Sequence, residues 1–284
     1  MRGMWLLAML LLAGCQHVVA PPPPISGEIR DLRSGEVLTA QQLVTRLAQP
    51  ERLIIGEQHD NADHHAAQLW LLQVLAEQRP QGSLLLEMLT PEQQPRVDQV
   101  RRAATPPADL PGALAWQDGW DWTLYGPIVR FALAQPWPLL SANLDNSEIR
   151  PIYRAPPLLS GERTNTASVK STLLEQIADS HCGLLPAAQM PAMLAVQQQR
   201  DRRMAERLMA APMPSTLLAG AWHARKDVGV PLHLLDLGAS QPPTVLMLAE
   251  QGGEVTSAMA DYVWYTPATP KQDYCEQMRK QFGK

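Results

Sequence analysis

Five short apolar runs constrain the fold of this chain more than any other feature. They occupy residues 53–55, 83–86, 139–142, 216–219 and 244–248, and none alternates apolar with polar positions. Runs of this kind are typical of strands that helices cover on both faces. Helical patterns lie between them, at about residues 60–79, 91–102, 123–135, 168–180 and 189–210. We therefore predict an α/β fold with a mostly parallel central sheet flanked by helices, including a helical excursion around residues 90–135.

The N-terminus has the layout of a secretory signal. Arg2 precedes an apolar stretch over residues 4–13, which is too short to cross a bilayer as a helix. The tetrapeptide Leu12-Ala13-Gly14-Cys15 resembles a bacterial lipobox, in which cleavage leaves the cysteine as a lipidated N-terminus. We predict a signal peptide at 1–14, a lipidated Cys15 with a Pro-rich tether over 15–35, and a single α/β domain over 36–284. A plain signal peptide with an incidental cysteine is the alternative.

Charge and hydropathy limit the partners of the chain. The formal net charge is −4 and no stripe of Lys or Arg is present, so we expect no nucleic-acid partner. Beyond the N-terminus no segment is long and apolar enough to cross a membrane, so we expect membrane contact through the lipid anchor only. Gln16, rather than aspartate, follows the cysteine, which by resemblance to enteric sorting rules predicts the outer membrane, with the protein facing the periplasm or the surface.

The C-terminal region contains a further strand pattern and a cysteine. The segment Asp-Tyr-Val-Trp-Tyr-Thr-Pro at 261–267 predicts an edge strand. Once Cys15 is set aside, Cys182 and Cys275 remain, and such a pair in an oxidising compartment is most simply a disulfide. Two buried free thiols are the alternative, which only geometry decides.

Polar residues follow four of the five apolar runs directly. Gly56-Glu57-Gln58-His59, Glu87, Asn143 and Gly220-Ala221-Trp222-His223 begin where the runs end. If the strands are parallel, these groups emerge at one carboxyl edge, where ligands bind in open α/β sheets. Two of the four have the form G-x-x-H, in which the glycine lets the backbone turn sharply and the histidine point back over the edge. We therefore predict a binding site at this edge.

Two more histidines follow His59 on the next predicted helix. Asp60 or Asn61 is suited to cap its first turn, which places His64 and His65 one turn in, on neighbouring sides. Because the N-terminus of this helix faces the same edge, we expect at least one of the two to overlook the pocket. The alternative is that both are solvated first-turn residues.

Taken together, these residues resemble a known family, the ChaN-like haem-binding lipoproteins of bacterial haem uptake. The resemblance runs from about residue 40 to 275 and has a more distant kinship with erythromycin esterases and TraB/Tiki-type metalloproteases. It is carried by Gly56-Glu57-Gln58-His59-Asp60-Asn61-x-x-His64-His65, Leu86-Glu87-Met88, Trp122-x-x-Tyr125-x-Pro127 and Gly220-x-x-His223-Ala224-Arg225.

The resemblance implies that ferric b-type haem is held near a homodimer interface, with two haems stacked face to face and a tyrosine as axial ligand. Tyr125 carries the family's pattern, and a phenolate is a hard anionic donor that suits ferric iron. A hydrogen bond from His59, His64, His65 or His223 would support it. Tyr153, Tyr262, Tyr265 and Tyr274 are rival ligands.

The surroundings of Tyr125 suit a porphyrin. Trp122, with Trp116 and Trp120, is placed to cover its faces, and Arg130 is placed to reach a propionate. An aromatic cluster is, however, more often part of a core than of a cofactor site. Both interpretations stand at this point.

The leading functional hypothesis is a lipid-anchored protein that receives, stores or relays ferric haem during haem and iron uptake, with an outer-membrane haem receptor or uptake system as partner. No bond-making reaction is required. The alternative is a metal-dependent esterase or peptidase in which Glu57, His59, Glu87 and His223 bind a divalent ion or act as acid and base. The H-E-x-x-H and C-x-x-C zinc signatures are absent. A third interpretation is a structural protein that retains the cavity as a relic.

Overall fold

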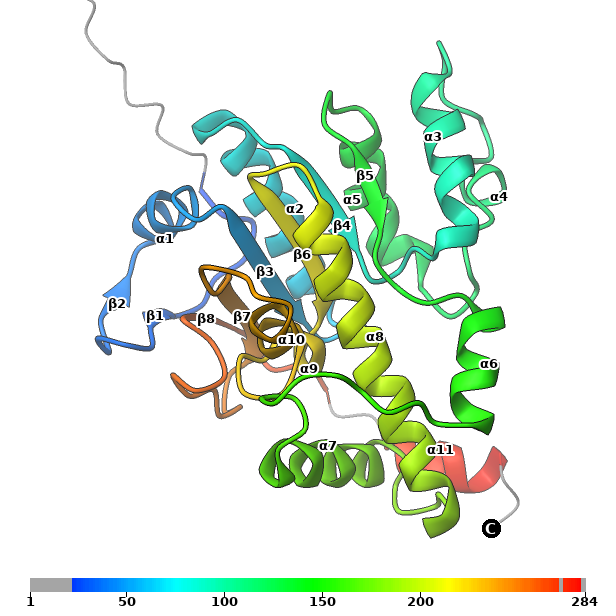
Figure 1. The fold of residues 1–284 in the computed structure, drawn as a ribbon. Coiled ribbons are helices and arrows are strands. Elements are labelled where there is room, and N and C mark those ends of the chain that lie inside the picture. Colours follow the sequence, from blue (N-terminus) through cyan, green and yellow to red (C-terminus); the bar gives the residue numbers. More distant parts are fainter. Residues whose placement is uncertain (1–21, 271–272, 282–284) are drawn as a thin grey trace, which may run out of the picture.

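One eight-stranded sheet forms the centre of the protein (Figure 1). The computed structural model describes residues 22–270 and 273–281, so the predicted signal peptide and Cys15 lie outside the described residues. The strand order is β2-β1-β8-β7-β3-β6-β4-β5. All neighbouring strands from β8 to β5 are parallel, whereas β1 is antiparallel to both β8 and β2. The strands are β1 (Ile29–Asp31), β2 (Val37–Leu38), β3 (Arg52–Glu57), β4 (Ser83–Leu86), β5 (Leu139–Ser141), β6 (Ser215–Gly220), β7 (Thr244–Glu250) and β8 (Tyr262–Thr266).

Helices cover both faces of this sheet. One face packs against α1 to α5, and the other packs against α8, α9 and α10, which Figure 1 shows on opposite sides of the strands. The helices are α1 (Ala40–Leu47), α2 (Ala62–Gln78), α3 (Gln94–Arg102), α4 (Leu110–Ala113), α5 (Trp122–Leu133), α6 (Asn146–Arg154), α7 (Ala167–Ser180), α8 (Met190–Ala210), α9 (Ala221–Ala224), α10 (Val230–Asp236) and α11 (Tyr274–Gln281). The predicted α/β class with a mostly parallel sheet is confirmed, and the excursion around 90–135 contains α3, α4 and α5.

The central strands are apolar throughout because each has two buried faces. On β3, Leu53 and Ile55 pack into the cluster that includes α2 and α5, while Ile54 between them packs into the cluster that includes α8 and α10. All three are fully buried. At about 1.5–3 kcal/mol for each large apolar side chain removed from water, such strands are a main source of stability.

The segment predicted as an edge strand is internal. β8 pairs with β7 on one side and with β1 on the other, so the predicted strand is confirmed but its predicted place at the edge of the sheet is wrong. The edge is formed instead by β1 and β2, and β1 begins at Ile29, inside the stretch predicted as a tether. With three and two residues, these strands are too short to give a period-2 pattern.

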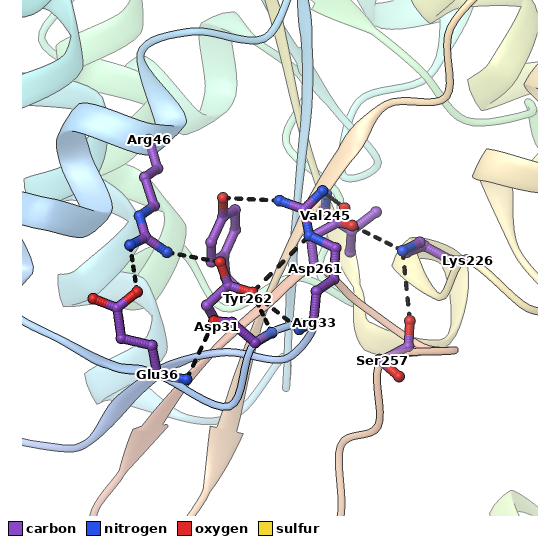
Figure 2. Close-up of polar contacts among 10 residues, drawn as sticks. Asp31, Arg33, Glu36, Arg46, Lys226, Val245, Ser257, Asp261 and Tyr262 are labelled. Atoms are coloured by element: carbon purple, nitrogen blue, oxygen red, sulfur yellow. Dashed lines mark hydrogen bonds and ion pairs between the residues drawn. The ribbon is translucent and has the colours of Figure 1, made fainter.

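Two buried carboxylates fasten this side of the sheet, as Figure 2 shows. Asp261 accepts the backbone N–H of Val245 at 2.9 Å and the ammonium of Lys226 at 2.8 Å. Asp31 accepts a hydrogen bond from Arg46 of α1 at 2.7 Å. Since a buried charge without partners is costly, these pairs fix the register in which β1, β7 and β8 meet.

The two remaining cysteines are joined. Cys182, just after α7, and Cys275 of α11 form the predicted disulfide, with their Cα atoms 5.5 Å apart. The bond ties the C-terminal helix to the body of the protein. Over the part of the chain that the structure describes, no helix has the length and apolar character needed to cross a membrane.

Acid should destabilise the protein through His233 of α10. Burial lowers the pKa of His233 to about 3, the side chain is fully buried, and neither ring nitrogen has a partner among the described residues. In the unfolded chain His233 has its ordinary pKa of about 6.5 and becomes protonated below that pH, whereas in the folded chain it stays neutral down to about pH 3. The free energy of unfolding therefore decreases as the pH is lowered from about 6.5 to about 3. The contribution is up to about 1.4 kcal/mol for each pH unit.

We expect His233→Leu to remove this contribution. Urea unfolding of both proteins between pH 7 and 4 measures it: the curve of unfolding free energy against pH should be flatter for the variant. Parallel curves would show that His233 is not the acid-sensitive group.

Candidate functional site

The carboxyl edge of the sheet brings the predicted residues together. Glu57 is the last residue of β3 and lies opposite Gly220, the last residue of β6. Glu87 directly follows β4, the other neighbour of β6. The two glutamates therefore flank the end of β6, and both are 1 % exposed. Two buried carboxylates this close to one strand end require hydrogen-bond donors or positive charge.

Glu57 is bound by a phenol and an imidazole. The hydroxyl of Tyr125, on α5, donates to Oε1 of Glu57 at 2.9 Å. Nδ1 of His59 lies 2.7 Å from the same oxygen and 3.1 Å from the Tyr125 hydroxyl. The other oxygen, Oε2, has no hydrogen-bond partner among the described residues. One carboxylate thus holds the two groups that the sequence proposed as haem ligand and as its support.

Aromatic rings close over this cluster. Trp120 lies edge-on to His59 at 4.8 Å and to Tyr125 at 5.8 Å between ring centroids. His65 packs edge-on to Tyr125 from the other side at 4.4 Å, and Trp116 lies 6.2 Å away. As a result Tyr125 is only 1 % exposed, whereas the His59 side chain is 45 % exposed.

The environment keeps the phenol protonated. Burial raises the pKa of Tyr125 far above its usual value, and the charge of Glu57 and the hydrogen bond to it raise it further. Burial lowers the pKa of His59, but the bond to Glu57 and the charges of Glu87 and Glu57 outweigh burial and raise it above its ordinary value. The Tyr125 hydroxyl therefore stays a hydrogen-bond donor to Glu57.

A second cluster surrounds Glu87. Its Oε2 accepts the backbone N–H of Gly220 at 2.7 Å, and its Oε1 lies 3.3 Å from Nε2 of His223. Nδ1 of His223 lies 2.6 Å from Asp201 of α8. Both ring nitrogens of His223 thus face carboxylates inside the protein.

These contacts make His223 a buried cation. Burial by itself lowers the pKa of His223, yet the charges of Glu87 and Asp201 raise it to about 10. Burial raises the pKa of Glu87, and the charge of His223 reverses that effect and lowers it well below the ordinary range. Burial raises the pKa of Asp201 to about 6, the net effect after the charge of His223 lowers it. At neutral pH the cluster is an imidazolium between two carboxylates.

Gly220 separates the two clusters. A Cβ atom at this position would lie 2.8 Å from Cε1 and Nε2 of His59 and 3.6 Å from Oε2 of Glu87. The φ angle of Gly220 is −58°, which any residue adopts, so lack of space is the reason for glycine here. The glycine allows the His59 ring to lie against the strand end.

The remaining histidines are buried in the first turn of α2. Asn61 caps this helix, accepting from the N–H groups of Asp63 and His64. Nδ1 of His64 accepts the N–H of Gln58 at 3.0 Å, and burial together with His65 lowers the pKa of His64 to about 4. His65 contacts Tyr125 directly, so one of the pair lines the cluster and the alternative of two solvated residues is wrong.

The family of the chain follows from comparison with known proteins. A family model described as haem-binding uptake, Tiki superfamily, ChaN matches residues 43–234. The chain belongs to this family. The predicted resemblance is confirmed, and membership supports haem binding.

Solved structures agree with this assignment. ChaN of Campylobacter jejuni, described as binding haem cofacially, is 29 % identical and superposes with a TM-score of 0.78 over 85 % of this chain and 97 % of its own. An erythromycin esterase, EreC, is 14 % identical with a TM-score of 0.46, covering 89 % of this chain and 86 % of its own. The second similarity is too low to carry a functional conclusion. Among functionally curated proteins, none matches the sequence.

Some residues predicted for the site lie apart from its centre. Trp122 packs against Trp116 at 5.0 Å, and the guanidinium of Arg130 lies 5.7 Å over the Trp122 ring, with Arg130 itself exposed. Neither touches Tyr125 in the contacts that the structure describes. Asn143 is buried but accepts only the N–H of Leu144 among the described residues.

The rival tyrosines are placed elsewhere or at the margin. Tyr262 accepts a hydrogen bond from Arg33 in the sheet, and Tyr274 donates to Asp60, next to His59. Tyr153 is half-buried on α6, and Tyr265 is half-buried on β8. Tyr125 is the one whose hydroxyl joins the strand-end carboxylates.

The predicted metal set is split between the two clusters. Glu57 and His59 belong to the first and Glu87 and His223 to the second, and both nitrogens of His223 are engaged. Within the described residues, no group of three or more His, Cys, Asp or Glu side chains is arranged to hold a metal ion. The alternative metal site is therefore not preassembled in this part of the chain.

Sequence reasoning left two contacts unassigned. The Glu57–Tyr125 bond joins residues 68 positions apart, and the contact of Asp201 with His223 joins two elements that no sequence motif connects. The structure places Asp201 fully buried against His223. The position of this aspartate on the apolar face of a long amphipathic helix is the sequence feature that could have predicted its burial.

We expect Asp201→Asn to lower the free energy of unfolding by about 3 kcal/mol, because it leaves a buried imidazolium with one carboxylate in place of two. Urea denaturation at pH 7 measures the loss. Glu206→Gln on the same helix is the matched control, since Glu206 is exposed and its pair with Arg202 contributes about 0.5 kcal/mol or less. Equal losses in the two variants would contradict a buried charge network.

Proposed function

We propose that this chain is a lipid-anchored haem-binding protein that receives, stores or relays ferric haem during bacterial haem and iron uptake, with Tyr125 as the axial ligand. The observation that carries the proposal is the Tyr125–Glu57–His59 cluster at the carboxyl edge of the sheet in a member of the ChaN family. Bound ferric haem would supply an iron centre that accepts a hard anionic donor.

The donor set fits this group. A phenol coordinates ferric iron as phenolate, so a proton must leave its oxygen. Oε1 of Glu57 already accepts that proton in a hydrogen bond, and His59 stands beside both atoms. Oε2 of Glu57 accepts no hydrogen bond among the described residues and lies 3.9 Å from Nε2 of His65, so it can accept a further hydrogen bond. Glu57 and His59 are therefore placed to accept the proton that the Tyr125 hydroxyl must lose.

Access to Tyr125 depends on its covering side chains. With 1 % of the residue exposed, a ligand that reaches the hydroxyl must displace Trp120 or His59, which pack against it. Both are partly exposed and therefore free to move outward. Trp116, Trp120 and Trp122 would then offer aromatic surface to a porphyrin, and exposed Arg130 would offer a cation to a propionate.

The assembly and the anchor belong to the same proposal. Because the Campylobacter jejuni relative binds haem cofacially, we expect two haems to stack across a homodimer here. The lipidated Cys15 and the tether would hold the protein at the outer membrane, facing the periplasm or the surface, beside a haem receptor or uptake system. The lipobox residues, which lie outside the described residues, and the resemblance support this part.

Tyr125→Phe tests the ligand. The change removes the donor oxygen and keeps the ring, so we expect affinity for ferric haem to fall at least about tenfold while the fold stays intact. Absorption titration with ferric haem measures affinity, and far-ultraviolet circular dichroism checks the fold. Tyr153→Phe, on α6, is the matched control.

The spectra identify the ligand independently. Wild-type protein should give a high-spin ferric spectrum that Tyr125→Phe abolishes and Tyr153→Phe preserves. An unchanged spectrum and affinity in Tyr125→Phe would refute Tyr125 and point to His59, whose half-exposed ring has Nδ1 bound to Glu57. Failure of the wild type to saturate would refute haem binding.

Gly220→Ala tests whether the His59 position supports the site. The new Cβ would meet the His59 ring at 2.8 Å and force it away from Glu57, so we expect haem affinity to fall by about tenfold or more. Gly119→Ala, in the loop before α5, is the control because a Cβ there has no atom within 4 Å. Equal affinities in the two variants would exclude a supporting role for His59.

The alternative function, a metal-dependent hydrolase, retains one favourable observation: Glu57, His59, Glu87 and His223 gather at one sheet edge. Its test is equilibrium dialysis of the purified protein against zinc. Stoichiometric binding that Glu87→Gln abolishes would support it.

A further inference from the structure

A groove lined by three arginines lies at the other side of the same sheet, beside the edge strand β5. Its volume is about 560 Å³, and its walls come from α3, β5 and α8. Figure 1 shows β5 at the edge of the sheet, between α3 and α8. The charged side chains that line the groove are Arg102, Arg203, Arg207 and Asp98.

The positive charge of the groove is only partly neutralised. Arg203 forms a bidentate pair with Glu148, at 2.6 and 3.2 Å, and so carries little net charge. Arg207 donates Nε to the carbonyl of Ser141 at 3.0 Å, and no carboxylate binds it in the part of the chain that the structure describes. Arg102 is exposed and has no partner among the same residues. With Asp98 and Glu148 counted against the three arginines, a positive charge remains.

A buried hydroxyl supplies a second and independent observation. Ser141 lines the groove and is 1 % exposed, yet its Oγ has no hydrogen-bond partner among the described residues. Its backbone is satisfied on the open side of β5, since its N–H donates to Gln94 at 2.7 Å and its carbonyl accepts from Arg207. A buried hydroxyl normally has a partner, and this one is unpaired among the described residues at a position that lines the groove.

We propose that this groove binds a phosphate group, with Arg102, Arg207 and Ser141 as its donors. The donors come from three different elements and therefore approach from three directions. A tetrahedral oxyanion has oxygens for all of them, whereas a carboxylate has two oxygens in one plane. Arg203 also lines the groove, but Glu148 already binds both of its terminal nitrogens. The phosphate is either free or part of a phosphomonoester lipid headgroup.

The test is phosphorus-31 NMR titration of the full chain in phosphate-free detergent at constant ionic strength. Inorganic phosphate and short-chain phosphatidic acid are the probes, with acetate as competitor. We expect saturable binding that weakens about tenfold in Arg102→Gln, in Arg207→Gln and in Ser141→Ala, which keeps the charge. Arg150→Gln, an exposed arginine of α6 outside the groove, should bind as the wild type does.

A variant that is expected to bind phosphate more tightly strengthens the test. Asp98→Asn removes the carboxylate of the groove and should tighten phosphate binding, with its Oδ1 still able to accept from Gln94. Tighter binding of phosphatidic acid than of inorganic phosphate would assign the site to a lipid headgroup, and equal binding would assign it to free phosphate. Absence of saturation by both probes, equal displacement by acetate, or equal losses in Arg150→Gln would overturn the proposal. Haem titration of the same variants should give the affinity of the wild type, so the phosphate proposal and the haem proposal can fail independently of each other.

Discussion

The buried carboxylate of Glu87 is the interaction on which the geometry of the carboxyl edge of the sheet depends. It lies buried between the backbone N–H of Gly220 and the ring of His223, which Asp201 holds from α8. Through these contacts one side chain fixes the ends of β4 and β6 and the short helix α9. A buried carboxylate imposes such an arrangement, because every partner it loses leaves charge without compensation in a low dielectric. The turn that places Gly220 under the His59 ring depends on this network.

The Glu57 cluster and the Glu87 cluster at the carboxyl edge of the sheet differ in how far they are buried. In the Glu87 cluster both oxygens of the Glu87 carboxylate and both nitrogens of the His223 ring are engaged, while Oδ2 of Asp201 has no hydrogen-bond partner among the described residues. The Glu57 cluster differs in its exposure: the His59 side chain is half-exposed, whereas the His223 side chain is buried. A buried, paired charge network mainly holds the fold, whereas a partly exposed cluster can also meet a ligand, and this difference supports the proposal of Tyr125, not His223, as the ligand. The two clusters thus follow β3 and β4, the two strands that flank β6.

The strands and helices that have a local sequence pattern could be predicted from the sequence alone. β3, β4, β6 and β7 were predictable because apolar runs report burial on two faces, and α8 because its pattern extends over many turns. The strand β8 was misplaced because its neighbour β1 has three residues and no pattern of its own. The bond of Tyr125 to Glu57 was beyond pattern reasoning, since it depends on how α5 packs on the sheet. Family resemblance identified Tyr125, and the fold supplied its partner.

The loop before α5 determines how a ligand reaches this partner. Nε1 of Trp116 donates to the carbonyl of Trp120 at 2.8 Å, so the two tryptophans that cover Tyr125 are linked to each other. Trp120 cannot turn away from Tyr125 and His59 by backbone movement without loosening Trp116, which packs on Trp122 at the start of α5. Side-chain rotation of Trp120 alone avoids that loss, because Trp116 binds the backbone and not the ring. If haem binds here, we therefore expect the site to open by local rotation of the Trp120 side chain, with the sheet and the Glu87 network unchanged.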